Sequence, residues 1–446
     1  MSSKHPQKTS LSVVSDPSET DGPSHSVPIA NDKGEKELGY TQVGEGNGEF
    51  SLRQDTPSED ITSIKVDMKY LVRALVKYNA SDLHIKVGRP PLYRINGKLI
   101  PTKMPAFTFE QAESVIFHVL SDRHKIILEE KRQVDFSFRV RELGRFRCNV
   151  YYQRGSIAAA IRMIPLTIPN FDSLNIPSVV KELIRRPRGL LLITGPTGSG
   201  KSTTMAAMIQ YLNETSQSHI LTLEDPIEFI FRDMKCSITQ RELGSDITSI
   251  QEGLHAGLRQ DPDIIMIGEL RDCDTIQAAL TAAETGHLVV STLHTNDAKS
   301  TIDRILDVFP PMAQNQIRYQ LASTLVGVIS QQLLLRIDGS GRIPACEVMV
   351  KSPLIENYIF KNELHKLSEA IANSSNYYKM QTANQALERL VKSRTISLET
   401  ALRASSSPDD LKLRLAGVTR DQGYDMAGPF GGNTHGGGTH GSGADE

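Results

Sequence analysis

The chain has 446 residues, of which 39% are hydrophobic and 23% charged, and its formal net charge is −2. This length is enough for two or three domains, and the near-neutral charge gives no general attraction to nucleic acid or to an anionic membrane. No apolar run reaches the roughly 18 residues that a membrane-spanning helix needs, and the four cysteines form no C-x-x-C pair, so we expect no direct membrane insertion, no disulfide framework and a reducing cytoplasm.

The two ends of the chain differ in composition from its middle. Residues 1–60 are rich in Ser, Thr, Pro, Gly and charge, without the apolar core of a secretory signal. Residues 416–446 form a Gly/His-rich tail. Segments with so few large apolar residues do not bury enough surface to offset the entropy lost on ordering. We therefore predict a disordered extension at each end.

Between these ends the chain begins with a small α+β domain, predicted over residues 62–165. VDMKYLVRALVKYN places apolar side chains at helical spacing and predicts a helix. DLHIKVG and PLYRINGKLI are predicted as two strands joined by a turn at 88–91, and a helix is predicted near 109–120. VDFSFRV, GRFRCNVYYQ and SIAAAIRMI are predicted as further strands, with turns at 142–144 and 154–155.

A linker rich in Pro and Asn, predicted over 166–185, separates this domain from a second one, predicted over 186–360. In the second domain the apolar runs LLLIT, HILTLED, DIIMIG and HLVVSTLH alternate with helical segments. Such alternation predicts an α/β fold with a parallel sheet covered on both faces. Residues 361–415 are predicted to be mostly helical.

The segment GPTGSGKST matches the phosphate-binding pattern G-x-x-x-x-G-K-[ST] and lies between a predicted strand and a predicted helix. Its glycines let backbone N–H groups wrap phosphates, and the helix N-terminus adds a favourable dipole. Lys201 is predicted to reach the β- and γ-phosphates, and Ser202 to bind Mg²⁺. The residues predicted to bind nucleotide are Gly195, Pro196, Thr197, Gly198, Ser199, Gly200, Lys201, Ser202 and Thr203.

Carboxylates follow the next two predicted core strands. Glu224 lies near the end of HILTLED, and Glu269 follows DIIMIG, whose Gly268 stands where a magnesium-binding Asp is expected. Ligands bind at the carboxyl ends of strands in open parallel sheets, so both acids are candidates for metal binding and water activation. The alternative is a helix cap or a surface ion pair, although Asp272 or Asp274 is better placed to cap the helix after Glu269.

The order of these motifs resembles the secretion ATPases of type II secretion and type IV pili, and within them the pilus retraction ATPases of the PilT family. Four boxes of that family occur in order, namely GPTGSGKST, ILTLEDPIEF, DIIMIGELRD and TGHLVVSTLHTNDA. The resemblance covers about residues 62–415. It implies a homohexamer in which a PAS-like N-terminal domain and a RecA-like P-loop ATPase core close over ATP and Mg²⁺, followed by C-terminal helices with Leu387 and Leu390 inward and Ile396 starting the last helix.

The resemblance also implies roles for individual residues. Arg147 and Arg162 match two arginines that the N-terminal domain supplies to the transferred phosphate, and Arg154 lies on the turn between them. From the residues alone, these arginines would be interpreted as solvated charges on strand edges. Glu224 is implied as the carboxylate that activates water and Glu269 as the Walker B acid at Mg²⁺, although the sequence allows the two roles to be exchanged.

Two histidines mark the fourth box of this family. His294 ends a predicted strand and is expected nearer the γ-phosphate than His287. From position alone, a histidine at a strand end is more often a satisfied structural residue than a phosphate sensor.

The function implied by the resemblance is an ATP-hydrolysing motor for pilus retraction and twitching motility. It implies a location in the cytoplasm, at the cytoplasmic face of the inner membrane, and as partners an inner-membrane pilus platform protein and other pilus ATPases. Extension ATPases of this superfamily carry a tetracysteine zinc motif, whereas Cys273 and Cys346 are isolated here, which favours retraction. A DNA-acting ATPase is disfavoured because the chain has no basic stripe.

One segment departs from the family pattern. SPLIENYIF takes the place of an AIRNLI-like segment, with Glu356 in an Arg place and Tyr358 in a Leu place. The alternatives that stay open are an accessory retraction paralogue, a type II secretion or pilus extension ATPase, and a low-turnover nucleotide-binding regulatory subunit.

Overall fold

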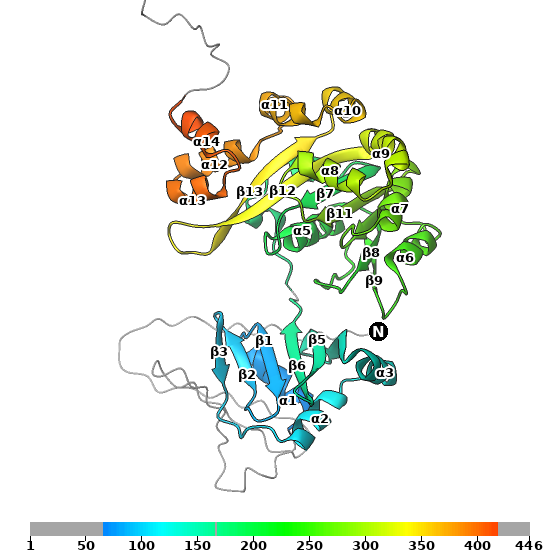
Figure 1. The fold of residues 1–446 in the computed structure, drawn as a ribbon, viewed down its shortest axis with the longest axis vertical. Helices are drawn as coiled ribbons and strands as arrows, with labels where there is room; N and C mark the ends of the chain where they lie inside the picture. The colour runs from blue at the N-terminus through cyan, green and yellow to red at the C-terminus, as the bar shows by residue number, and fades with distance from the viewer. Residues whose placement is uncertain (1–65, 166, 418–446) are drawn as a thin grey trace, which may run out of the picture.

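The computed structural model describes residues 66–165 and 167–417. The extension predicted over 1–60 and nearly all of the tail predicted over 416–446 lie outside the described residues. Figure 1 shows an N-terminal sheet domain (blue and cyan) below a larger sheet domain (green and yellow) that ends in helices (orange). None of the described helices is both long and apolar enough to cross a membrane.

The N-terminal domain is a six-stranded sheet in the order β3-β2-β1-β6-β5-β4, in which every neighbouring pair is antiparallel. Alternate side chains, among them Leu83, Phe146 and Ile161, pack with the three helices in one apolar cluster, so the residues between them lie on the opposite face. Its elements are α1 (Met68–Lys77), β1 (Asp82–Lys86), β2 (Leu92–Ile95), β3 (Lys98–Pro101), α2 (Phe109–Phe117), α3 (Asp122–Lys131), β4 (Gln133–Val140), β5 (Gly144–Gln153) and β6 (Ser156–Met163).

Two predictions for this domain were wrong in detail. PLYRINGKLI is not one strand but the hairpin β2–β3, because Asn96 and Gly97 both adopt positive φ, as a tight two-residue hairpin turn requires. The helix predicted near 109–120 is followed by a second helix, α3, because the Ser121 side chain accepts a hydrogen bond from the backbone N–H of His124 and starts a new helix.

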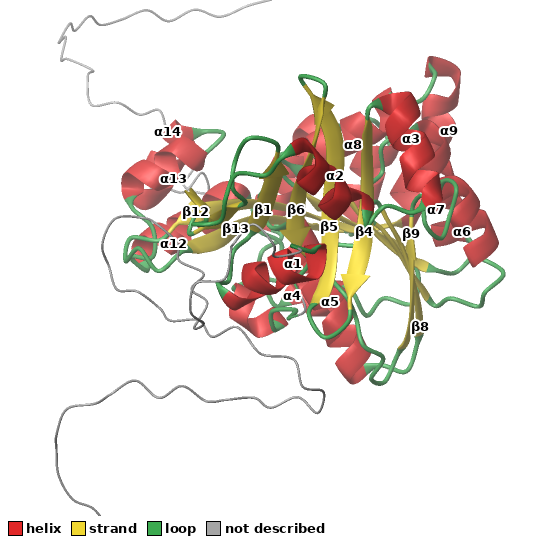
Figure 2. Ribbon diagram, turned by 90° about the horizontal axis from the view of Figure 1, so that it is seen from below, coloured by secondary structure: helices red, strands yellow, loops and turns green. Residues whose placement is uncertain are grey.

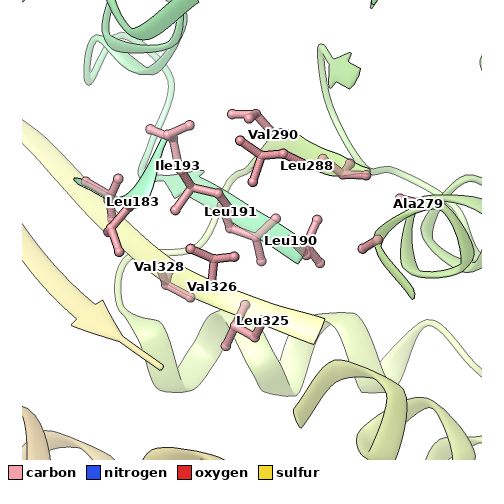
Figure 3. Packing of buried hydrophobic residues seen from close by; sticks show 14 of the residues in the cluster. Leu183, Leu190, Leu191, Ile193, Ala279, Leu288, Val290, Leu325, Val326 and Val328 are labelled. Carbon is pink, nitrogen blue, oxygen red and sulfur yellow. The ribbon is translucent and has the colours of Figure 1, made fainter. Parts of the chain in front are cut away.

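The second domain is a seven-stranded sheet in the order β13-β12-β7-β11-β10-β8-β9. The interior strand β7 lies between β11 and β12, and its Leu190, Leu191 and Ile193 are fully buried (Figure 3). Its elements are β7 (Gly189–Thr194), α5 (Lys201–Thr215), β8 (His219–Glu224), β9 (Ser237–Glu242), α6 (Ile250–Gly257), β10 (Ile264–Ile267), α7 (Cys273–Glu284), β11 (Leu288–Leu293), α8 (Ala298–Asp307), α9 (Pro311–Thr324), β12 (Leu325–Leu335) and β13 (Arg342–Val350).

The four predicted strands are parallel, and the sheet also contains an antiparallel edge strand that was not predicted. The strands from β12 to β9 are parallel, but β13 returns from β12 through a short connection at 336–341 and is therefore antiparallel. Within the segment predicted as a linker, η2 (Phe171–Leu174) and α4 (Val179–Leu183) place Phe171 and Leu183 in the core of this second domain.

The helices after residue 380 cover the β12–β13 hairpin, on the opposite side of the sheet domain from α6 and α7 (Figure 2), whereas the helices at 353–373 pack into the main core of this domain. Leu387 and Leu390 are buried against this hairpin, as the resemblance implied. Ile396 does not start the last helix, because it precedes α13 and a further helix follows. The helices are α10 (Pro353–Phe360), η3 (Leu364–Lys366), α11 (Leu367–Asn373), α12 (Ala383–Lys392), α13 (Leu398–Ala404) and α14 (Pro408–Leu415).

The two sheet domains contact each other beside the end of β9. The buried Glu242 carboxylate accepts hydrogen bonds from Ser137 Oγ at 2.7 Å and from Arg145 Nη2 at 3.1 Å, both in the N-terminal domain. Its Oε2 atom also accepts one from the backbone N–H of Ile227 at 3.1 Å. One acidic group therefore joins β4 and β5 to the larger domain.

We expect Arg145→Ala to loosen this contact, because it leaves the buried Glu242 carboxylate without its cation at a cost of roughly 1–3 kcal/mol. Hydrogen–deuterium exchange should become faster in β4, β5 and the end of β9. Arg139→Ala is the matched control, since Arg139 is an exposed arginine on β4. Equal effects of the two variants on exchange would contradict this role for Arg145.

Candidate active site

The phosphate-binding loop joins β7 to α5, and α5 begins at Lys201. Gly195 and Gly200 have φ values of 140° and 91°, in the region that glycine favours. A Cβ atom at Gly195 would lie 2.1 Å from the backbone oxygen of Gln331, and one at Gly200 would lie 2.8 Å from Gln331 Nε2. The backbone angles therefore favour glycine at both positions, and the backbone of β12 leaves no room for a side chain at Gly195.

Lys201 lies inside the loop to which it belongs. Its side chain is buried, and Nζ donates hydrogen bonds to the backbone oxygens of Gly195 at 2.8 Å and Pro196 at 3.1 Å. Burial lowers the pKa of the Lys201 ammonium, although the charge of Glu269 acts in the other direction. The same Nζ lies 3.5 Å from His294 Nδ1, so the predicted phosphate-binding lysine and the predicted sensor histidine are neighbours.

Gln331 on β12 holds the loop and was not predicted. Its Nε2 donates to the backbone oxygen of Ser199 at 2.7 Å, and its Oε1 accepts from Thr204 Oγ1 at 2.8 Å. The side chain is buried, so both bonds are shielded from water. The only sequence signal for this residue is a polar Gln-Gln pair inside an apolar run, and that pair does not reveal which loop it contacts.

We expect Gln331→Ala to weaken ADP binding about 10-fold, because the loop loses two buried hydrogen bonds and keeps two unsatisfied polar groups. Titration with a fluorescent ADP analogue measures the effect. Gln332→Ala is the matched control, because the neighbouring Gln332 donates instead to Ala404 in the C-terminal helices. Unchanged ADP affinity in Gln331→Ala would show that the loop is held by its backbone alone.

Glu224 ends β8 and is 5% exposed. Its carboxylate accepts hydrogen bonds from Thr222 Oγ1 at 2.7 Å, Gln240 Nε2 at 3.1 Å and the backbone N–H of Glu228 at 3.3 Å. Burial outweighs these bonds and raises the pKa of Glu224 to about 7. A carboxylate with this pKa can accept a proton near neutral pH, which is the property of a general base.

Glu269 follows β10 and has a different environment from Glu224. Its side chain is 24% exposed, and its two oxygens lie 2.9 Å from Arg271 Nε and 3.3 Å from His294 Nε2. Arg271 also reaches Asp225, with Nη1 3.5 Å from Oδ2. The two predicted acids therefore differ in kind, since Glu224 is buried and accepts hydrogen bonds from neutral groups, whereas Glu269 is half-buried and paired with cationic or titratable groups.

The alternative interpretation of Glu269 as a helix cap is wrong, because Asp272 caps α7 by accepting a hydrogen bond from the backbone N–H of Thr275 at 2.8 Å. His287 does not lie near the loop. It precedes β11 and therefore sits at the opposite edge of the sheet from His294, which follows the same strand.

Arg147 and Arg162 are register partners on β5 and β6, on the face of the N-terminal sheet opposite its helices. Both line a cleft of about 960 Å³ between the two sheet domains. Arg154, on the turn between the same strands, does not line it, nor do Gly195, Pro196 and Ser199. The other predicted residues that line the cleft are Thr197, Gly198, Gly200, Lys201, Ser202, Thr203, Glu224, Glu269 and His294.

Two further cations line this cleft without having been predicted. Arg271 belongs to the segment DIIMIGELRD, just after the end of β10. Its ion pair with Glu269 explains why a basic residue follows the strand at this point. Arg342 begins β13, a strand that the sequence pattern missed. Together with Lys201, Arg147 and Arg162 they make the cleft a place where a polyanion is attracted from both domains.

Comparisons with known proteins agree with this geometry. A family model described as "Type II/IV secretion system protein" matches residues 58–408. The "Type IV pilus retractation ATPase PilT" of Pseudomonas aeruginosa is 42% identical over 345 residues, which are 77% of this chain and 100% of that protein. A "Twitching motility protein" of Neisseria gonorrhoeae is 41% identical over 321 residues, which are 72% of this chain and 86% of that protein.

A solved structure is also similar. The crystal structure of the pilus retraction motor PilT with bound ADP superposes with a TM-score of 0.72 at 46% identity, covering 78% of this chain and 99% of that one. The predicted α/β fold with a RecA-like core and the predicted resemblance to retraction ATPases are confirmed. The chain belongs to the Type II/IV secretion system protein family.

Proposed function

We propose that this chain is an ATP-hydrolysing motor that drives type IV pilus retraction. The observation that carries the proposal is the cleft between the two domains, where the phosphate-binding loop, two acids of different character and two arginines of the N-terminal sheet meet. Phosphoryl transfer needs these groups, because it depends on positioning and on the stabilisation of charge rather than on covalent chemistry by the protein. The names of the relatives supply the pilus and the direction of work.

The environments of the two acids support a division of their roles. Glu224 has a pKa of about 7 and accepts hydrogen bonds only from neutral groups, so we assign it the activation of the attacking water. Glu269 pairs with His294, which is a neighbour of Lys201 in the phosphate-binding loop, and its charge acts on Lys201, so we assign it to the metal. Lys201 neutralises charge on the β- and γ-phosphates, and Arg147 and Arg162 stabilise the charge that develops on the transferred group.

The donors in the cleft fit Mg²⁺, which binds hard oxygen atoms and takes one or two protein ligands beside phosphates and water. The Ser202 hydroxyl and the Glu269 carboxylate, both in the cleft, would hold it. When bound, Mg²⁺ neutralises phosphate charge as the leaving group departs.

The motor would work by closing the two domains over ATP and reopening them after hydrolysis. In this proposal Arg147 and Arg162 contact phosphate only when the cleft is closed, so the chemical step depends on the domain movement. The proposal includes a homohexamer at the cytoplasmic face of the inner membrane, acting on a pilus platform protein alongside other pilus ATPases.

ATP hydrolysis by the purified protein tests the enzymatic part. We expect Lys201→Ala to lower the rate by roughly 10²–10³-fold, because the phosphates lose a preorganised cation. Lys235→Ala, which changes an exposed lysine outside the cleft, should hydrolyse at the wild-type rate. Equal rates of hydrolysis by wild type and Lys201→Ala would show that the turnover does not come from this site, and the proposed motor would be wrong. Cells that lack the protein should be hyperpiliated and non-twitching, and a loss of pili instead would refute retraction.

A further inference from the structure

A row of charged and polar side chains crosses the N-terminal sheet. Arg94, Asp82, Arg162, Arg147 and Ser137 are successive register partners on β2, β1, β6, β5 and β4. Residues that are directly opposed in an antiparallel sheet point to the same face, so the row lies on the face opposite the helices. Like charges directly opposite each other are destabilising, and Arg147 beside Arg162 is such a pair.

Asp82 is the one acid in this row, and both of its carboxylate oxygens have polar partners. It is 8% exposed, and its Oδ1 accepts a hydrogen bond from Arg162 Nε at 2.8 Å. Oδ2 accepts one from Ser81 Oγ at 2.8 Å and lies 3.5 Å from Arg94 Nε. Burial opposes ionisation, but the bonds from Ser81 and Arg162 and the charge of Arg162 outweigh it and lower the pKa of Asp82. The group that holds Arg162 is therefore an ionised and immobile carboxylate.

Arg162 is held at one atom only. Its side chain is 68% exposed, and among residues 66–165 and 167–417 its two terminal nitrogens have no hydrogen-bond partner. A guanidinium held through Nε keeps the N–H groups of its two terminal nitrogens free. These N–H groups match the geometry of phosphate oxygens. Since Arg162 lines the cleft, its free nitrogens belong to the same space as the phosphate-binding loop.

We propose that Asp82 is a positioning residue for ATP hydrolysis, which fixes Arg162 through Nε so that its terminal nitrogens are presented to the transferred phosphate. This inference rests on the proposed function. This role of Asp82 also explains how Arg147 and Arg162 are tolerated side by side. The Asp82 carboxylate offsets their repulsion from the far side of Arg162, and the arginine side chains keep a positive charge in the cleft. Without Asp82, the exposed side chain of Arg162 would move away from Arg147 and lose its alignment before ATP binds.

The test is a double-mutant cycle measured as kcat for ATP hydrolysis by the full chain. Asp82→Ala is expected to lower kcat by about 10- to 100-fold, the effect of misplacing a catalytic group by about 1 Å. Affinity for ADP should be unchanged, because ADP lacks the γ-phosphate, whereas affinity for a non-hydrolysable ATP analogue should fall. In an Arg162→Ala background, the same Asp82 substitution should change kcat by less than about 2-fold, because the two residues act as one unit.

Matched variants separate positioning from folding. Arg94→Ala removes the other cation on Asp82 but leaves the Arg162 bond, and it should keep wild-type kcat. Should Asp82→Ala fail to fold, Asp82→Asn keeps the shape without the charge, and its loss of kcat should be smaller but still absent in the Arg162→Ala background.

Two results would overturn the inference. One is an equal fold-loss of kcat from the Asp82 substitution with and without Arg162, which would mark a purely structural role. The other is wild-type kcat in Asp82→Ala or Asp82→Asn. Neither of these two results would contradict the proposed function. The proposed function fails instead if ATP hydrolysis does not depend on Lys201.

Discussion

Glu224→Gln is expected to lower kcat for ATP hydrolysis by roughly 10²–10⁴-fold while ADP still binds, because the amide keeps the shape of the side chain but cannot take a proton from water. Single-turnover hydrolysis and ADP titration measure the two effects separately. Glu347→Gln is the matched control. Glu347 is a second buried acid whose pKa is raised to about 7 by burial, but it accepts a hydrogen bond from the backbone N–H of Ala298, away from the cleft.

The same residue predicts a pH dependence of kcat/KM, which reports groups of the free enzyme. Burial raises the pKa of Glu224 to about 7, so below this pH most molecules carry a protonated, inactive Glu224. Activity should therefore rise with pH through about 7 and reach a plateau above it. A flat profile between about pH 6 and 8 would show that Glu224 is not the base, and the division of roles between Glu224 and Glu269 would then be reversed.

Arg147→Ala and Arg162→Ala are each expected to lower kcat steeply, with an upper range of about 10³–10⁵-fold for a residue that acts as an arginine finger. ADP affinity should change little, because both arginines act on the transferred group. Arg154→Ala provides the control, since Arg154 lies on the turn between the same two strands and does not line the cleft. If all three variants lost activity equally, the cause would be the net charge of the domain.

The parts of the site that the sequence predicts are those encoded over a few consecutive residues. The loop 195–203, Glu224 and Glu269 are each tied to a local strand end, and parallel strands bring their carboxyl ends to one edge of a sheet. Gln331 and Asp82 escaped prediction because their partners lie far away in the chain. Gln331 contacts the phosphate-binding loop and α5, and the partner of Asp82, Arg162, is set by the pairing register of β1 and β6.

The missed strands have physical causes as well. β9 is the edge strand SITQRE, which is polar because one flank of an edge strand faces solvent, and it lacks the apolar run by which buried strands are found. β12 and β13 are apolar, but they follow a helix and return through a short connection, so the βα alternation that indicates a parallel sheet does not include them.

The domain contact at Glu242 has a mechanical consequence. Glu242 and Glu224 are register partners on β9 and β8, and the backbone N–H of Leu243 donates to the backbone carbonyl oxygen of Glu224 at 2.9 Å. A force that pulls the two domains apart would therefore load the β8–β9 pair at the strand end that carries Glu224.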